Sequence, residues 1–367
     1  MNIIFEVPDT ECVRFGEFSC LFGENLIYQL KSGEIKSLKL PDKEVEKIFK
    51  LENKISRMLH CDGGLFLFDK DNNLYSYSGS EFLTLENEIG IFPRLPLFSN
   101  FALAKKRLSN RSYKYFIFNL LKREVLFEIP HTIDFFFDEM AFLLKDDQIV
   151  SYKIEEDRLN VLWEFNFESL PNYYSPHFEK YVIDDVNRWV GAHNQILWIE
   201  LNSSKLIGLD INTGALKYEI FEPKYIGKDA DGREMIFNLG SVLNLDSENG
   251  LLIGLWDSYY LEYDLNSNSP YLKKIDLKNQ FLDFHPFAFD MKDIGFLQFN
   301  NSFIVGYDKM EGKFCVFDRE TKNINSKVKL DFGDRKGGGA KILSSLICEN
   351  HVVIGDCFGT LRIFKTE

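Results

Sequence analysis

The sequence predicts an all-β protein built from repeated four-stranded units, and three observations support this prediction. Phe is abundant at 35 of 367 residues and Pro is scarce at 10, and aromatic side chains favour the pleated, half-buried surface of a strand. An apolar run, a short polar turn and an alternating run recur about every 46 residues. Residues 2–7 form an apolar segment without a unit of its own, and residues 361–364, the last strand of the final unit, have an open edge.

Eight copies of the unit are predicted as β-hairpins, because Gly, Asn, Asp and Ser occupy the turns between their apolar runs. The hairpins begin at Asn25, Gly64, Phe101, Met140, Ile196, Leu251, Phe303 and Val352. One further strand precedes each hairpin and one follows it, as in "DIGFLQFNN" from Asp293, "KILSSLICEN" from Lys341, "VLFEIP" from Val125 and "ALKYEIF" from Ala215. Four short antiparallel strands at this period are typical of a β-propeller blade. We therefore expect a single domain over residues 1–367, a propeller of eight blades, with seven as the alternative.

The two chain ends are expected to share one blade. The last unit supplies three strands, and residues 2–7 ("NIIFEV") form a strand without a blade of its own. Pairing them with residues 361–364 would close the ring and remove an open edge that could aggregate. Ile3, Ile4, Phe5 and Val7 are also costly to leave in water. The alternative is a loose tail over residues 1–8.

Residues 208–220, "GLDINTGALKYEI", resemble the pyrroloquinoline-quinone-like repeat, in which a strand ends in Asp, the turn carries Thr-Gly and an aromatic follows. "VFDRETKNINSKV", "YDLNSNSPYLKKI" and the terminal "VVIGDCFGTLRIF" are weaker versions. Family members that bind the quinone are usually exported, carry a docking Trp in many blades and often have a vicinal Cys pair. Here Tyr218 stands at the docking position, only Trp163 falls at a comparable place, and no vicinal pair occurs. The resemblance implies the fold without the cofactor, and we expect none. WD40 repeats are the other relative, although their Gly-His and Trp-Asp signature does not recur.

Charge and composition exclude some classes of binding partner and cellular location. A net charge of −13 argues against nonspecific nucleic-acid binding, which needs a basic surface, and against anionic membranes; it is compatible with a basic protein partner. The N-terminus "MNIIFEVPDTEC" lacks the basic start and apolar run of a signal peptide, and no apolar run approaches membrane-spanning length. The six Cys include no CxxC pair, as expected of free thiols in a reducing cytoplasm.

Motifs that would carry chemistry are incomplete. "DKDNNLYSYSGS" begins like a calcium loop, but Leu74 replaces the required Gly and Ser80 the bidentate Glu. "KDADGRE" fails similarly at Arg233, and "GDRKGGGAKI" lacks the P-loop Lys and the helix that should follow. The six His are not at metal-ligand spacing, and no nucleophile motif occurs. Adjacent carboxylates, Asp146–Asp147 and Asp184–Asp185, would point to opposite faces of a strand. We expect no metal and no catalytic residue.

Four long connections between blades are the predicted binding surface: residues 168–188, 222–240, 278–292 and 332–340. With antiparallel strands, these connections and the turn between the second and third strand of each blade fall on one face of the ring. Long loops on a rigid scaffold often carry function, and Tyr, Trp and Arg dominate binding hot spots. The predicted partner-binding residues are Tyr173, Tyr174, His177, Tyr181, Arg188, Trp189, Arg233, His285, Arg335 and Lys336.

These observations predict a non-enzymatic, cytoplasmic propeller that binds a protein partner through the long connections. A sequestering role, such as that of a bacterial immunity protein, would suit it. The first alternative is a quinone-type propeller enzyme or small-ligand protein that uses the central channel. The second is a subunit of a larger assembly that makes contact through its outer blade edges.

Overall fold

The computed structural model describes the following residues: 1, 3–8, 10, 19–22, 24–40, 43–51, 55–61, 64–69, 73–77, 82–86, 89–92, 99–108, 112–175, 178–203, 205–221, 225–228, 234–237, 243–256, 259–267, 269–277, 280, 298–308, 311–332 and 341–366. Apart from one 3₁₀ turn, their regular secondary structure is β-strand. The prediction of an all-β protein is confirmed.

The strands of the described residues form eight four-stranded antiparallel sheets and two two-stranded ones. Four sheets occupy the first half of the chain: β2 (Ser19–Phe22), β3 (Asn25–Gln29), β4 (Glu34–Lys39) and β5 (Glu44–Lys50); β6 (Ile55–Cys61), β7 (Gly64–Asp69), β8 (Leu74–Tyr77) and β9 (Phe82–Glu86); β10 (Ile89–Phe92), β11 (Phe101–Arg107), β12 (Tyr113–Asn119) and β13 (Glu124–Ile129); β14 (Phe135–Phe137), β15 (Met140–Lys145), β16 (Gln148–Ile154) and β17 (Leu159–Asn166).

Four more occupy the second half: β20 (Val186–His193), β21 (Ile196–Leu201), β22 (Lys205–Asp210) and β23 (Leu216–Phe221); β26 (Asn244–Asp246), β27 (Leu251–Trp256), β28 (Tyr259–Asp264) and β29 (Leu272–Asp276); β30 (Gln298–Phe299), β31 (Phe303–Asp308), β32 (Lys313–Asp318) and β33 (Asn323–Lys329); β34 (Ile342–Cys348), β35 (His351–Asp356) and β36 (Leu361–Lys365) with β1 (Ile3–Val7). The predicted hairpins are the two middle strands of each sheet, from β3–β4 to β35–β36, and all of them are confirmed as antiparallel pairs.

Two connections contain small sheets of their own. Between β17 and β20 lie the 3₁₀ turn η1 (Phe167–Ser169), β18 (Tyr173–Ser175) and β19 (Lys180–Val182). Between β23 and β26 lie β24 (Tyr225–Lys228) and β25 (Glu234–Phe237). The expectation that these connections are plain loops is therefore wrong. The other two predicted connections lie largely outside the described residues.

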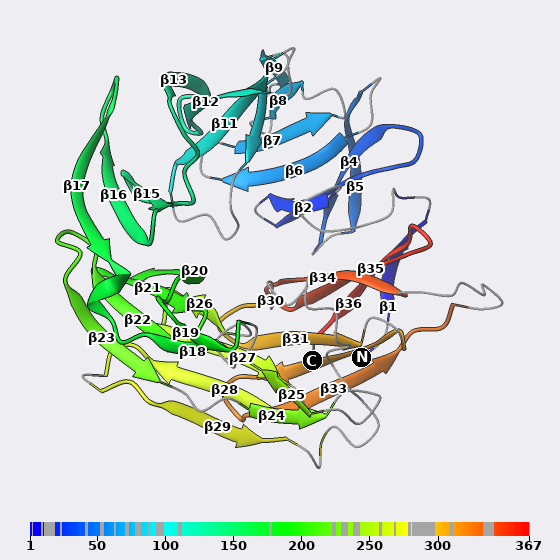
Figure 1. Ribbon diagram of the computed structural model, residues 1–367. Helices are drawn as coiled ribbons and strands as arrows, with labels where there is room; N and C mark the ends of the chain where they lie inside the picture. The colour runs from blue at the N-terminus through cyan, green and yellow to red at the C-terminus, as the bar shows by residue number, and fades with distance from the viewer. Residues whose placement is uncertain are drawn as a thin grey trace.

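The chain ends meet in one sheet. β1 pairs antiparallel with β36, with Phe5 opposite Ile363 and Val7 opposite Leu361. The predicted pairing of the two ends is confirmed for residues 3–7, and a loose tail there is wrong. Figure 1 shows the sheets following one another around a common centre, with the N- and C-termini close together.

The core lies between sheets. Each of the eight buried clusters combines residues of two neighbouring sheets, from β2–β5 on β6–β9 onward. The last cluster joins Val353, Leu361 and Ile363 of the C-terminal sheet to Leu26 and Tyr28 of the first. Apolar faces on both sides of every sheet explain why the strands read as near-continuous hydrophobic runs.

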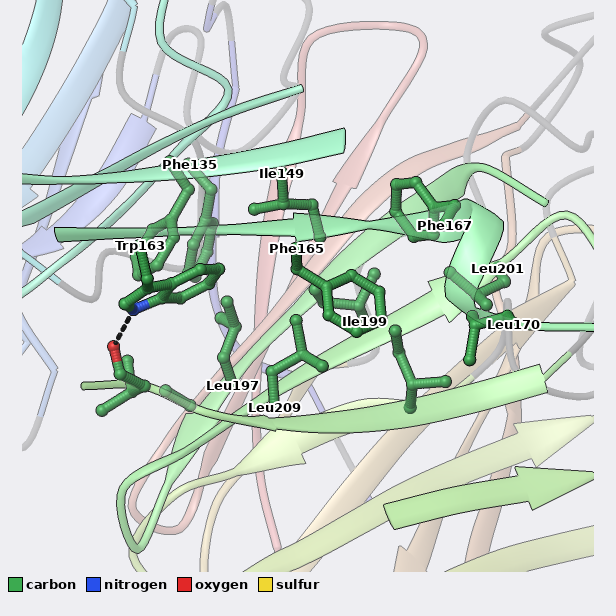
Figure 2. Packing of buried hydrophobic residues seen from close by; sticks show 14 residues of the cluster. Phe135, Ile149, Trp163, Phe165, Phe167, Leu170, Leu197, Ile199, Leu201 and Leu209 are labelled. Atoms are coloured by element: carbon green, nitrogen blue, oxygen red, sulfur yellow. Dashed lines mark hydrogen bonds between the residues drawn. The ribbon is translucent and has the colours of Figure 1, made fainter. Parts of the chain in front are cut away.

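Trp163 shows how one sheet docks on the next. Its indole N–H donates to the carbonyl of Ile211, 2.8 Å away, across the junction between β14–β17 and β20–β23 (Figure 2). The ring lies against Gly214, where a Cβ would sit 2.6 Å from the indole Cε3. Gly214 also has φ of +71°, a conformation that glycine adopts without strain. The docking position predicted for Trp163 is thus a contact between neighbouring sheets.

Candidate functional site

The connection between β17 and β20 stands over the turns of two neighbouring sheets. Its first end is anchored by buried Phe167, whose N–H donates to the carbonyl of Asp147 in the β15–β16 turn at 3.0 Å. At its second end the carbonyl of Asp185 accepts the N–H of Asn202, in the β21–β22 turn, also at 3.0 Å. The segment is therefore held on the face that carries the turns between second and third strands, as predicted for the long connections.

The hairpin β18–β19 presents one aromatic face to solvent. Tyr174 lies opposite Tyr181, and their rings meet edge to face at 5.6 Å. Tyr174 is 50% exposed, Tyr181 71% and Phe178, near the hairpin tip, 60%. We call these three residues the aromatic patch. Exposed aromatic side chains held on a paired backbone can contribute binding energy with little loss of conformational entropy.

The other face of the hairpin points back toward the protein. Ser175 is buried, and Tyr173 is half-buried. Burial raises the pKa of Tyr173, and the carboxylate of Asp184 raises it further. The period-two alternation of strands accounts for the split between the two faces.

Three carboxylates act on the charge of Asp185, at the end of the connection; we call Asp134, Asp147, Asp184 and Asp185 the acidic cluster. Asp184 is only 1% exposed, and its Oδ1 accepts the N–H groups of Asp185 and Ser203, each at 3.1 Å. Its Oδ2 has no hydrogen-bond partner in the structure. Burial raises the pKa of Asp185, opposed by the N–H of Val186, while the charges of Asp147, Asp184 and Asp134 raise it further. The charges of the other three carboxylates therefore act on Asp185.

The acidic cluster corrects an expectation from the sequence. Adjacent carboxylates were expected to point to opposite faces of a strand, so that cooperation between them could not be assumed. Asp184 and Asp185 instead lie between β19 and β20, and Asp147 lies in a turn with φ of +58°. The alternation of a strand does not apply to them, and the fold brings them within electrostatic range of one another.

Arg188 and Trp189 lie on strand β20, and their predicted place in a loop is wrong. The guanidinium Nε of Arg188 is 3.2 Å from Oε2 of the buried Glu200, and Nη2 donates to the carbonyl of Leu243 in the next sheet. The Trp189 ring stacks on Phe135 at 5.5 Å. Both side chains hold sheets together, because β20 starts earlier than the sequence indicated. A contact of either with a partner stays a prediction.

Three of the predicted binding residues, Tyr173, Tyr174 and Tyr181, are brought together on one hairpin. The remaining five, His177, Arg233, His285, Arg335 and Lys336, lie outside the described residues. Asp134 and Asp147 were not predicted, because neither belongs to the connection itself. No sequence signal links them to the hairpin, since the fold alone sets that distance.

Neither a metal site nor a membrane-spanning helix is found in the described part of the chain. There, no group of three or more His, Cys, Asp or Glu side chains is arranged to hold a metal ion. Within the same residues no helix has the length and apolar character needed to cross a membrane.

Comparison with known proteins shows a likeness of fold. No protein-family model and no curated protein sequence matches the chain. The C-terminal WD40 domain of Sif2 superposes with a TM-score of 0.57 at 10% identity, over 100% of this chain and 98% of that one. Sqt1 from Saccharomyces cerevisiae, also a WD40 protein, gives 0.52 at 11% identity over 100% and 99%. BamB from Moraxella catarrhalis gives 0.43 at 10% identity over 84% and 96%. The chain thus resembles the WD40 domains at the level of fold.

Proposed function

We propose that the eight four-stranded sheets are the blades of one closed β-propeller. The pairing of β1 with β36 and the packing of the last sheet against the first support closure. The eight inter-sheet clusters support a count of eight over seven, and the WD40 domains align over nearly their whole length. In such a ring every sheet has two neighbours.

The proposed ring is a non-enzymatic, cytoplasmic interaction module that binds a protein through the aromatic patch. The observation that carries this proposal is the exposure of Tyr174, Phe178 and Tyr181 together on a hairpin anchored at both ends. Large aromatic side chains exposed together mark interaction sites. A sequestering or immunity role stays a prediction.

The experiment compares two Tyr residues of equal exposure on opposite faces. Tyr181 is 71% exposed on the aromatic patch, and Tyr271 is 72% exposed in the β28–β29 turn, which alternation of the strands places on the other face. The tagged full chain and its Tyr181→Ala and Tyr271→Ala variants are used to capture partners from the cells that express it, with quantitative mass spectrometry. We expect at least one protein to be lost with Tyr181→Ala and kept with Tyr271→Ala. Equal recovery by all three proteins would contradict the proposal.

A further inference from the structure

Three buried carboxylates elsewhere in this protein are each matched by an Arg. Glu200, Asp246 and Asp356 are each nearly inaccessible, and they pair with Arg188, Arg319 and Arg362 respectively. A buried charge without a partner is costly, because it loses hydration without a compensating attraction. In each of these three pairs the Arg supplies the compensating attraction.

Asp184 departs from this pattern. It is as buried as the three paired carboxylates, yet among the described residues no Lys or Arg forms an ion pair with Asp184, Asp185 or Asp147. Its Oδ2 has no hydrogen-bond partner. Asp185, on which the charge of Asp147 also acts, adds negative charge beside Asp184 instead of compensating it. Among the described residues, Asp184 and its neighbours Asp185 and Asp147 therefore lack the cation that Glu200, Asp246 and Asp356 have.

A cation can reach this cluster from outside. Asp147 is exposed and Asp185 is half-buried, so both can be contacted without opening the fold, while Asp184 adds its charge from beneath. Tyr173 borders the carboxylates and could place its ring against a cation. On the other side of the same hairpin lies the aromatic patch, which suits the aliphatic stem or neighbouring apolar residues of a protein segment.

Resting on the proposed function, we infer that the acidic cluster receives an arginine or lysine side chain of the protein partner. The cation lies against Asp147 and Asp185 in the field of Asp184, and the flanking segment of the partner covers the aromatic patch. The partner is thus a protein with a basic, exposed segment. Charge complementarity of this kind sets specificity and association rate.

The test uses N-acetyl-arginine amide as the probe and the ring resonances of ¹³C-labelled Tyr173 as the readout, assigned with a Tyr173→Phe variant. The test variant is Asp147→Asn/Asp185→Asn. Asn keeps an acceptor for the N–H of Val186 and tolerates the positive φ of residue 147. The control is Glu156→Gln/Asp157→Asn, which changes net charge equally in the exposed β16–β17 turn on the opposite face.

We expect a saturable shift of Tyr173 with the arginine probe and none with N-acetyl-glutamine amide. The test variant should bind about tenfold more weakly, which corresponds to about 1.4 kcal/mol, and the control variant should bind like the wild type. An absent shift, or equal weakening in both variants, would overturn the inference. If capture depends on Tyr181 but not on Asp147 and Asp185, the proposed function stands and this inference fails.

Discussion

Arg362 is predicted to stabilise the sheet that joins the chain ends. Its Nη1 donates to Oδ2 of Asp356, and its Nε donates to Oε1 of Glu6 on β1 at 2.9 Å. Asp356 is 0% exposed, and its Oδ1 already accepts the N–H groups of Phe358 and Thr360, both at 2.9 Å. An Arg362→Met substitution keeps the apolar stem and removes the charge, which leaves Asp356 buried and unpaired.

The magnitude follows from that unpaired charge. Removing one partner of a buried ion pair costs about 3–5 kcal/mol. A chain of 367 residues unfolds with an entropy of about 0.8 kcal/mol/K, so the melting temperature should fall by about 4–6 °C. The loss should be smaller in Arg362→Met/Asp356→Asn, because Asn still accepts the turn N–H groups and carries no charge. In this double variant the ion pair between residues 356 and 362 is absent, but no unpaired charge is buried at residue 356.

The assay is thermal unfolding followed by circular dichroism, with calorimetry to check that each variant unfolds in one transition. Arg158→Met is the control, because Arg158 pairs with Glu155 at 3.3 Å while 66% exposed, and such pairs contribute about 0–1 kcal/mol. The reasoning is refuted if Arg362→Met melts within 1 °C of the control, or if the double variant is less stable than the single one.

Three further predictions concern the core. Gly214→Ala should lower the free energy of unfolding by about 2 kcal/mol or more, because the new Cβ meets the rigid indole of Trp163 at 2.6 Å. Urea denaturation measures this change, and an unchanged free energy of unfolding would contradict the contact between Gly214 and Trp163. Burial raises the pKa of the Cys315 thiol to about 12, so iodoacetamide and mass spectrometry should find it unmodified in the folded protein and modified in urea; modification in the folded protein would be the contrary result. Burial also raises the pKa of Tyr28 from 10.0 to about 12. The contribution of Tyr28 to the free energy of unfolding is therefore full below pH 10.0 and is lost as the pH rises toward 12, because Tyr28 ionises first in the unfolded chain. In Tyr28→Phe the urea midpoint should fall less steeply between pH 10.0 and 12, and a fall as steep as that of the wild type would contradict this prediction.

The repeated hairpins could be predicted because their signal is local. In "LLIGLWDSYYLEYDLNS" the apolar strands β27 and β28 sit next to each other in sequence, and their pairing needs only a turn between them. The pairing of β1 with β36 was also predictable, although the strands lie at opposite ends of the chain. The last unit lacked a fourth strand and the first strand of the chain lacked a unit, so each could be predicted as the partner of the other.

Other features had no such signal. Arg319 and Asp246 are 73 residues apart and meet only because neighbouring sheets pack. The strands β18 and β19 lie in a segment that the sequence predicts as a long loop; each has only three residues, although Tyr and Val favour strands. The start of the next strand, β20, also determines where Trp189 lies. Because strand β20 begins at Val186, Trp189 lies on that strand and its ring stacks on Phe135 instead of facing solvent.

Asp184 and Asp356 differ in how the fold satisfies them, and the difference connects stability to binding. Both are buried, and both accept two backbone N–H groups at one carboxylate oxygen. The second oxygen of Asp356 receives Arg362 from the adjacent strand, whereas that of Asp184 receives no hydrogen bond. The charges of Asp147, Asp184 and Asp134 also raise the pKa of the neighbouring Asp185. A fold that pairs Glu200, Asp246 and Asp356 with Arg side chains, but leaves the second oxygen of Asp184 without a hydrogen bond, gains most from the cation that we propose a partner supplies.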